Sequence, residues 1–351
     1  MTTNGNSRPV NGAGEWTGYE RLVAALHHRE PDRIPFDLGG SMVTGINVRA
    51  LTALRQALGL PGQAQVLDRV TQMAETGDDI RDCLGVDVRS VRPDPPGQPG
   101  LARDLGLAGE YDRLIDEFGM GWRMPLHGGH YYDLYLSPLV DCQTVADIER
   151  HPWPDALDTA RYEGFRQRVD QVVRRERRGV VVERMHAGMW EHAMWMRGYE
   201  RFFMDMATDP VMVHAIMSKE LEIKMAYWGR VLDLLDEHTL VLSTADDLGT
   251  QSGPLVSVGM YKDLIWPYHR RLFQFLKSRA RTEADTVASS MCCPNPRLGL
   301  GGACSSTMTR RFLTSFTESS ERASSSASCF CSSVSTLPES VTTPPSVWVF
   351  I

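Results

Sequence analysis

Hydrophobic and polar positions up to about residue 280 alternate between helical stripes and short apolar runs. Helical periodicity begins after Thr17, which has capping-box spacing to Glu20 and precedes an apolar face formed by Tyr19, Leu22 and Leu26. Short apolar runs rich in β-branched residues predict buried strands. Four such runs are present: Ile34–Leu38, Val86–Val91, Val180–Glu183 and Thr239–Ser243.

Further helical stripes lie between and after these runs. Asn47 is a candidate N-cap for a helix with Val48, Leu51, Leu54 and Leu58 on its buried side. Other helices are expected over residues 68–84, 159–177, 190–206, 210–235 and 258–279, the last of them kinked at Pro267.

The alternation of single apolar strands with helices predicts parallel βα units, and therefore an α/β protein of the (β/α)8 TIM-barrel type. Four strands are visible where a closed barrel needs eight, so we expect an incomplete barrel with only its first half present. Residues 93–138 are rich in Gly, Pro and aromatic side chains, and Gly121–Met124 and His130–Tyr135 have hairpin character. We expect this insertion to pack over one mouth of the barrel.

The last part of the chain has a different composition. From Thr286 onward it is rich in Ser, Thr, Cys and Pro, and it holds five of the seven cysteines: Cys292, Cys293, Cys304, Cys329 and Cys331. Such a segment buries too little apolar surface to offset its ordering entropy, so we expect residues 285–351 to be a disordered tail without a core strand. A frameshift near Arg281–Ala288 is the preferred explanation, and a genuine Ser-rich tail or a metal-binding tail is the alternative. The chain then divides into a disordered arm (1–14), a partial barrel (15–284) and this tail.

Composition and charge exclude several classes of function. The chain of 351 residues is 42% hydrophobic and 23% charged, as in soluble globular proteins. Its formal charge of −7 leaves no basic footprint for nucleic acid. No apolar run approaches the roughly 20 residues of a membrane helix. Met1–Gly14 is polar and lacks the pattern of a signal peptide, so a cytoplasmic protein is expected.

The strongest candidate for chemistry is the segment Ala245–Gln251, in which Asp246 and Asp247 follow a buried strand. The loops after such strands carry the active sites of α/β enzymes, so both aspartates are predicted to be catalytic. They could orient a basic or hydroxylated ligand, or hold a proton through a raised pKa. Gln251 and Tyr261 are expected to add hydrogen bonds to a substrate. The alternative is a loop cap in which Asp247 binds backbone amides and Asp246 faces water.

Two further loops are candidates. Asp37, Gly39 and Gly40 end the first predicted strand and could form a substrate-binding floor, because glycine amides can approach an anionic group closely; the alternative is a simple turn. His186 follows the Val180 run and is a candidate catalytic residue. Together with Glu183, Glu191 and His192 it could move protons or bind metal, or it could belong to an ordinary polar loop.

Two segments carry a resemblance to a known family. EPDRIPFDLGGSMVTGI (Glu30–Ile46) and ADDLGTQSGPLVSVGMYKDLIWPYHRRLF (Ala245–Phe273) together resemble the uroporphyrinogen decarboxylase superfamily, and more closely its branch of cobamide-dependent methyltransferase-like proteins. The resemblance spans Trp16 to Arg281. It implies a (β/α)8 barrel with its pocket at the carboxyl ends of the strands, a small-molecule substrate, and pairing into a homodimer. It further implies zinc and a corrinoid protein as the partner in methyl transfer.

This chain departs from both branches at the residues that bind ligands. The decarboxylases hold a tetrapyrrole with arginines after the first strand and an aspartate after the second. Here the first loop is Gly39–Met42, and Asp87 falls inside the predicted second strand. The methyltransferases hold zinc with a His-x-Cys motif, expected just after Ala284, where the chain has Ser290-Met291-Cys292-Cys293. No metal ligand is therefore assigned from the resemblance.

Three hypotheses follow. The first, which we prefer for the family, is a corrinoid-linked methyltransferase that is impaired as translated. The second is a decarboxylase of a tetrapyrrole such as uroporphyrinogen, or of a related carboxylated substrate. The third is a truncated, inactive barrel whose open sheet exposes unpaired strand edges.

Overall fold

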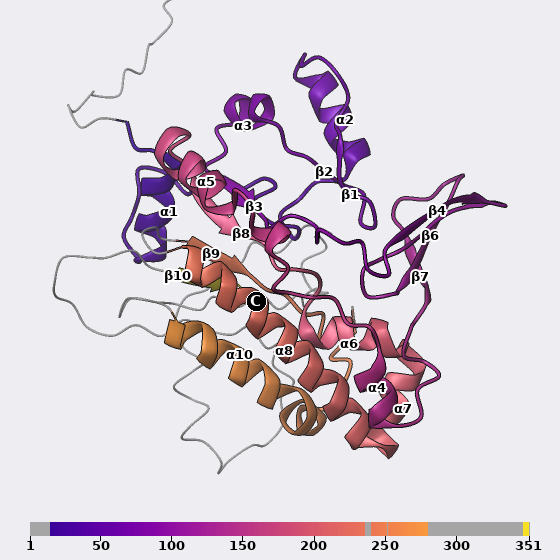
Figure 1. The fold of residues 1–351 in the computed structure, drawn as a ribbon. Coiled ribbons are helices and arrows are strands. Elements are labelled where there is room, and N and C mark those ends of the chain that lie inside the picture. Colours follow the sequence, from indigo (N-terminus) through magenta and orange to yellow (C-terminus); the bar gives the residue numbers. More distant parts are fainter. Residues whose placement is uncertain (1–14, 236–239, 251, 280–346, 351) are drawn as a thin grey trace, which may run out of the picture.

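A computed structural model of the chain describes residues 15–235, 240–250, 252–279 and 347–350 (Figure 1). Its centre is a parallel sheet of four strands. In spatial order these are β10 (Val347–Phe350), β9 (Leu240–Ser243), β8 (Gly179–Val182) and β3 (Val88–Val91). Strands β3, β8 and β9 are thus neighbours in the order in which they occur in the sequence. The parallel α/β class is confirmed, and closure into a barrel stays a prediction.

The alternating side chains of these strands divide the core between the two faces of the sheet. Val88, Val181 and Val241 pack against Leu22 and Leu26 of helix α1 (Gly18–Leu26). Helix α1 has the predicted capping box, in which Thr17 and Glu20 bind each other's backbone amides. The opposite face supplies Val180, Val182 and Leu242 to the largest apolar cluster.

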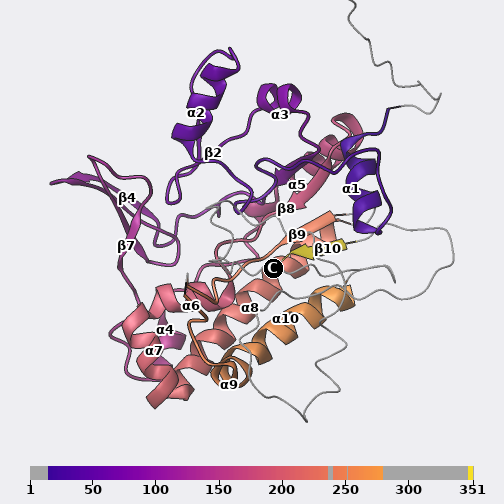
Figure 2. The same ribbon diagram turned by 180° about the vertical axis from the view of Figure 1, so that it is seen from behind.

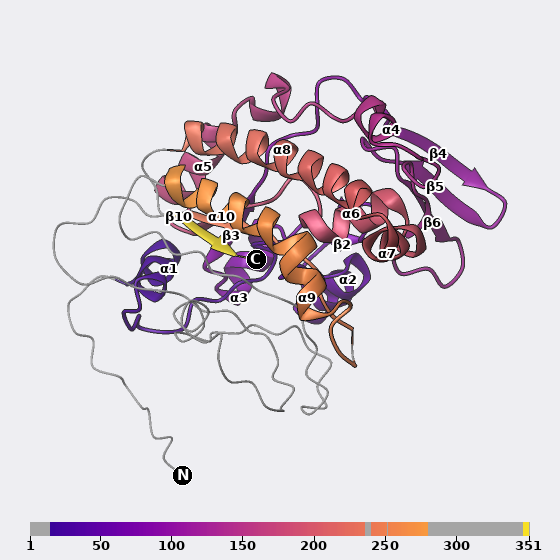
Figure 3. The ribbon, with the colours of Figure 1, turned by 90° about the horizontal axis from the view of Figure 1, so that it is seen from below.

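Long helices cover that opposite face. Helix α8 (Pro210–Leu234) and helix α10 (Trp266–Arg279) lie side by side along it (Figure 3). The predicted helix over 258–279 is confirmed as α9 (Val258–Met260), a π-turn η3 (Tyr261–Ile265) and α10. The wide turn lies directly before Pro267, whose nitrogen cannot donate a hydrogen bond.

The remaining helices match the sequence pattern in part, since the helix Val145–Arg150 was not predicted and Gly164 interrupts the helix expected over 159–177. They are α2 (Val48–Ala57), α3 (Asp78–Leu84), α4 (Val145–Arg150), η1 (Thr159–Tyr162), α5 (Phe165–Asp170), the π-turn η2 (Gln171–Arg175), α6 (Met189–Arg197) and α7 (Tyr199–Thr208). Asn47 caps α2 as predicted, accepting a hydrogen bond from the amide of Arg49. No helix among the described residues is both long and apolar enough to cross a membrane.

The aromatic insertion forms an antiparallel sheet that projects beside α4 and α7 (Figure 2). Its strands are β4 (Arg103–Ala108), β5 (Tyr111–Ile115), β6 (Gly121–Pro125) and β7 (Asp133–Leu136), in that order. The hairpin strands predicted in this segment are thereby confirmed. The turn between β5 and β6 sends Phe118 into the main apolar cluster.

Three expectations about secondary structure are wrong. Residues 68–84 do not form one helix: β1 (Val66–Asp68) pairs with β2 (Met73–Ala74), and α3 starts only after Gly77. Ala74 and Ile80, which are part of the apolar pattern that suggested a helix, instead pack with Leu51 in a small hydrophobic cluster. The tail does contribute a strand, because β10 pairs in parallel with β9.

The third correction concerns Ile34–Leu38, which is not a strand. Ile34 is 84% exposed, and the segment is fastened to the sheet mainly through one side chain. The Phe36 amide donates to the Asp87 carboxylate at 2.8 Å, and the Asp87 amide donates to the Phe36 carbonyl at 2.8 Å. Asp87 therefore holds Ile34–Leu38 in place of the ladder of backbone hydrogen bonds that a strand would form.

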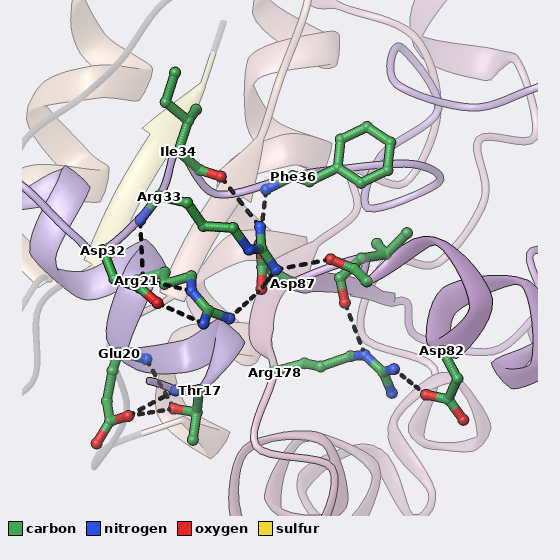
Figure 4. A network of polar contacts seen from close by, with 12 residues as sticks. Thr17, Glu20, Arg21, Asp32, Arg33, Ile34, Phe36, Asp82, Asp87 and Arg178 are labelled. Atoms are coloured by element: carbon green, nitrogen blue, oxygen red, sulfur yellow. Dashed lines mark hydrogen bonds and ion pairs between the residues drawn. The ribbon is translucent and has the colours of Figure 1, made fainter. Parts of the chain in front are cut away.

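Asp87 is the centre of a network at the amino end of the sheet (Figure 4). It lies directly before β3 rather than inside the strand, and its carboxylate pairs with Arg33 and, at 3.1 Å, with Arg21. Arg21 also makes two bonds to Asp32, at 2.7 and 2.8 Å. Asp87 is buried, so these arginines supply the opposite charge that its burial requires.

Candidate functional site

The loops after β8 and β9 meet at the carboxyl end of the sheet, and Gly188 is the point of contact. A side chain at Gly188 would place its Cβ 1.9 Å from the Ala245 carbonyl oxygen and 2.0 Å from Asp246 Oδ1. Only glycine therefore allows the two loops to approach this closely. The start of α6 therefore lies against Asp246.

Asp246 is buried, with 4% of its surface exposed, and both of its carboxylate oxygens are engaged. Oδ1 accepts a hydrogen bond from the Glu191 amide at 2.8 Å, and Oδ2 lies 2.7 Å from His269 Nε2. In the loop-cap alternative, Asp247 binds backbone amides and Asp246 faces water. Asp247, not Asp246, is the exposed residue of the pair, and its backbone carbonyl accepts from Trp190 Nε1 at 3.0 Å.

A polar chain runs through Asp246, His269 and Tyr261, of which the first two are buried and the tyrosine is half-buried. The Tyr261 hydroxyl lies 3.1 Å from His269 Nδ1. An ionised Asp246 can only accept, so Nε2 carries the imidazole proton and Nδ1 accepts from the tyrosine. Burial, and then the charge of Asp246, raises the pKa of Tyr261. The predicted residues Asp246 and Tyr261 thus come together through a histidine.

His269 was not singled out in the sequence. The available signal was its spacing, because residues eight apart in a continuous helix lie on similar faces, and Tyr261 precedes it by eight. That signal depends on α9, η3 and α10 forming one helical stretch. The link to Asp246 is a tertiary contact that periodicity does not reveal.

Burial displaces the pKa values of several ionisable groups near Asp246, His269 and Tyr261. Burial, followed by the charges of Asp246 and Asp247, raises the pKa of Glu191 to about 8. Burial lowers the pKa of Lys224 to about 8, and its ammonium donates to the Ala187 carbonyl at 2.6 Å. Partial desolvation and the neighbouring Asp246 also raise the pKa of Asp247.

Asp37, Gly39 and Gly40 form the turn that was the alternative to a binding floor. Asp37 Oδ1 accepts from the Gly40 amide at 2.7 Å, and Gly39 has a φ of +78°. Burial raises the pKa of Asp37, and the nearby charge of Glu183 adds to this effect. The turn is joined to the end of β8, because the Met42 amide donates to Glu183 Oε1 at 2.8 Å. These residues therefore lie beside the site, although their hydrogen bonds are those of a turn.

A cavity of about 310 Å³ opens next to Gly39. Four arginines line it: Arg81, Arg89, Arg92 and Arg168. Arg89 pairs with Glu176, and Arg168 lies 3.0 Å from Asp94.

His186 belongs to a second buried group, with His192 and Glu220. One potential ligand atom from each of the three lies within 4.8 Å of the others. His192 Nδ1 is 2.7 Å from Glu220 Oε1, and the two imidazole ring centroids are 4.1 Å apart. Burial holds the pKa of His186 well below its usual range. The expected neighbour His192 is present, whereas Glu183 and Glu191 are not members of this group.

Glu220 was also missed in the sequence. It lies on α8, 28 residues beyond His192, and it is fully buried. A carboxylate within the apolar stripe of a helix was the available signal. Gln251, the remaining predicted site residue, lies outside the described residues.

No protein-family profile matches the chain, and no curated protein matches it. Among solved structures, a methyltransferase from Methanosarcina mazei is similar, with 14% sequence identity and a TM-score of 0.45. The match covers 80% of this chain and 71% of that chain. Membership of the uroporphyrinogen decarboxylase superfamily therefore stays a prediction.

Proposed function

We propose that this chain is a methyltransferase-like enzyme of the uroporphyrinogen decarboxylase superfamily, which moves a methyl group between a corrinoid protein and a small-molecule thiol. The observation that carries the proposal is the polar chain Asp246–His269–Tyr261 after β9. All three residues belong to the segment Ala245–Phe273, on which the resemblance rests.

The geometry supports a general base for the thiol. Methylation forms a sulfur–carbon bond, and the thiol proton must leave. Asp246 fixes the His269 imidazole so that Nδ1 accepts a proton, and the Tyr261 hydroxyl lies 3.1 Å from that nitrogen. An imidazole oriented by a buried carboxylate is the usual arrangement for such a base. The corrinoid would supply the methyl group: its cobalt–carbon bond would break with the electron pair left on cobalt, and the thiol proton would pass to the His269 base.

Zinc of the kind held by the resembled methyltransferases does not fit this sequence. Their motif begins with histidine where this chain has Ser290, and residues 280–346 lie outside the described residues. No step is therefore assigned to zinc at that position. A histidine base would take over the work that zinc performs there, which is lowering the barrier to thiol deprotonation.

The test uses the full chain with methylcobalamin as the methyl donor and 2-mercaptoethanol as the acceptor. We expect thiol-dependent loss of methylcobalamin absorbance and formation of the methyl thioether. Asp246→Asn and His269→Gln should each slow the reaction by about 100-fold or more, the usual contribution of a positioned base. The matched control is His214→Gln, because His214 also contacts a tyrosine, Tyr268 at 2.9 Å, but outside the site.

Equal rates for Asp246→Asn, His269→Gln and the control would refute the role of this polar chain. No thiol-dependent reaction by the folded wild-type chain would refute methyl transfer. Rapid proteolysis of the purified chain, together with no activity, would favour the third hypothesis of an inactive partial barrel.

Decarboxylation of a carboxylated substrate is the second candidate, and the arginine-lined cavity favours it. Arginine binds carboxylates through paired hydrogen bonds. Among the described residues, Arg92 donates only to the Met42 sulfur at 3.7 Å, which leaves its guanidinium available to an anion. Release of CO₂ from uroporphyrinogen, lost in Arg92→Gln, would support this candidate over methyl transfer.

A further inference from the structure

His186, His192 and Glu220 leave more buried polar atoms without a partner than any other group of described residues. Both ring nitrogens of His186, Nε2 of His192 and Oε2 of Glu220 form no hydrogen bond. These are four of the eleven such side-chain atoms in the described part of the chain. Buried polar groups in native proteins almost always have partners, so a cluster of exceptions points to a missing ligand.

The three side chains converge from separate elements. His186 comes from the loop after β8, His192 from α6, and Glu220 from α8. One donor atom from each lies within 4.8 Å of the other two. The hydrogen bond of 2.7 Å between His192 and Glu220 already holds two of them together. Two of the three side chains lie on helices, and His186 lies on the short loop between β8 and α6, so the scaffold holds the group in place.

An aromatic cover closes the group. The Phe118 ring packs edge-on against His186 at 4.1 Å and against His192 at 4.4 Å between ring centroids. Asp116 fixes this cover, because its carboxylate accepts hydrogen bonds from the Phe118 and Met120 amides and from the Trp122 indole nitrogen. Asp116 is thereby fully engaged, and the donor set remains two imidazoles and one carboxylate.

We propose that His186, His192 and Glu220 bind one divalent transition-metal ion, with zinc as the best match. Two histidines and one glutamate are a ligand set of catalytic zinc sites, in which a fourth position remains open. Imidazole suits zinc and its neighbours in the first transition row, whereas magnesium and calcium prefer sites built from oxygen. The site differs from the cysteine-rich tail and from the Asp246 chain, and it does not depend on the proposed methyl transfer.

The surrounding charges are compatible with such an ion. Lys224 interacts electrostatically with Glu220, and its ammonium donates to the Ala187 carbonyl. Arg161 and Arg184 also act electrostatically on His186. Each of the three cations has another partner: Lys224 the Ala187 carbonyl, Arg161 the Glu117 carboxylate and Arg184 the Glu183 carboxylate. An ion here would take one lone pair from each imidazole and one from the Glu220 carboxylate, so it would satisfy at most three of the four unpartnered atoms and leave one ring nitrogen of His186.

The first experiment measures metal bound to the full chain after chelator treatment and reloading. Co²⁺ serves as the spectroscopic probe, and Zn²⁺ competes with it; Mg²⁺ is the negative control. We expect one equivalent of Co²⁺ with visible d–d bands and displacement by Zn²⁺. His186→Ala and Glu220→Gln should each weaken binding by about 100-fold or more, since even loss of an outer-shell partner costs about 10–100-fold.

Two controls separate this site from other metal-binding groups. His127→Ala removes an exposed histidine and should leave the bands unchanged. Replacement of Cys292, Cys293, Cys304, Cys329 and Cys331 by serine should also leave them unchanged. Glu220→Gln keeps the size of the side chain and the acceptor for His192, so near-ultraviolet circular dichroism should show a native fold.

X-ray absorption of the zinc-loaded wild-type chain decides the outcome without any variant. A shell of nitrogen and oxygen with imidazole scattering supports the proposal. A sulfur shell, bands that vanish with the cysteine replacements, or a folded wild-type chain that takes up no metal would each overturn it.

Discussion

Two buried aspartates at opposite ends of one parallel sheet have opposite surroundings. Asp87, before β3 at the amino end, pairs with Arg21 and Arg33 and accepts from a backbone amide. Asp246, after β9 at the carboxyl end, has an amide and an imidazole as its partners, and its neighbours include further carboxylates. Two arginine ion pairs compensate the charge of Asp87, whereas Asp246 contacts His269 and interacts with Lys224 electrostatically.

The different surroundings suggest that Asp87 has a structural role and Asp246 a chemical one. A carboxylate held between two guanidinium groups fastens distant parts of the chain to one another. A carboxylate that orients a histidine, beside groups whose pKa values are displaced, has the features of a site that handles protons.

The largest expected effect comes from removing the compensated charge. Asp87→Ala leaves Arg21, whose side chain is 9% exposed, without its buried partner, and should cost about 3–5 kcal/mol of unfolding free energy. Urea denaturation measures this loss. Asp82→Ala is the control, because Asp82 is 70% exposed in its pair with Arg178 and its loss should cost about 0–1 kcal/mol. Similar losses in both variants would contradict the structural role of Asp87.

Asp246→Asn should have a smaller effect on stability than Asp87→Ala. The substitution removes the charge from the hydrogen bonds to His269 and the Glu191 amide but leaves no unpaired ion, and should cost about 1.5–3 kcal/mol. Urea denaturation of the two variants in the same buffer makes the comparison. An Asp246→Asn variant less stable than Asp87→Ala would reverse the roles assigned to the two ends.

Gly188→Ala tests the close contact at the carboxyl end. Its Cβ would collide with backbone at Ala245 and with Asp246, so we expect about 1–3 kcal/mol of destabilisation. Gly253→Ala is the matched control, since nothing lies within 4 Å of its Cβ position. Thermal unfolding of both variants gives the result. A neutral Gly188→Ala variant would show that the loops do not meet as described.

The smallest expected effect is on the pH dependence of stability. Burial raises the pKa of Asp37 above its ordinary value of 3.8 and that of Glu183 above 4.5. The folded state then keeps protons that the unfolded chain has released, so the unfolding free energy falls as pH rises from these ordinary values through the raised ones. At the amino end the sign is opposite, because the hydrogen bonds from Arg21 lower the pKa of Asp32.

Glu183→Gln should therefore gain stability relative to the wild type as pH rises through this window. Urea unfolding at a series of pH values measures the difference, with Glu149→Gln, at an exposed position, as the control. Parallel pH profiles for Glu183→Gln and the wild type would contradict a raised pKa at Glu183.

Much of the fold could be predicted because local patterns determine it. The capping box at Thr17, the Asn47 cap and the valine-rich strands depend on neighbours within a few residues. Prediction failed where a distant residue decided the outcome. Ile34–Leu38 looks like a strand, yet Asp87 fixes it through one carboxylate, and Val347–Phe350 becomes a strand through pairing with β9.

The sequence by itself determined the parallel α/β class, and it predicted the loop at Asp246 and His186 as candidate sites. It did so because strand and helix periodicity, and carboxylates after a buried strand, are local signals. Only the tertiary structure decided the partners of these residues. His269 reaches Asp246 across 23 residues, and Glu220 reaches His192 across 28. Such contacts arise when helices pack on a sheet, and no spacing along one chain specifies them.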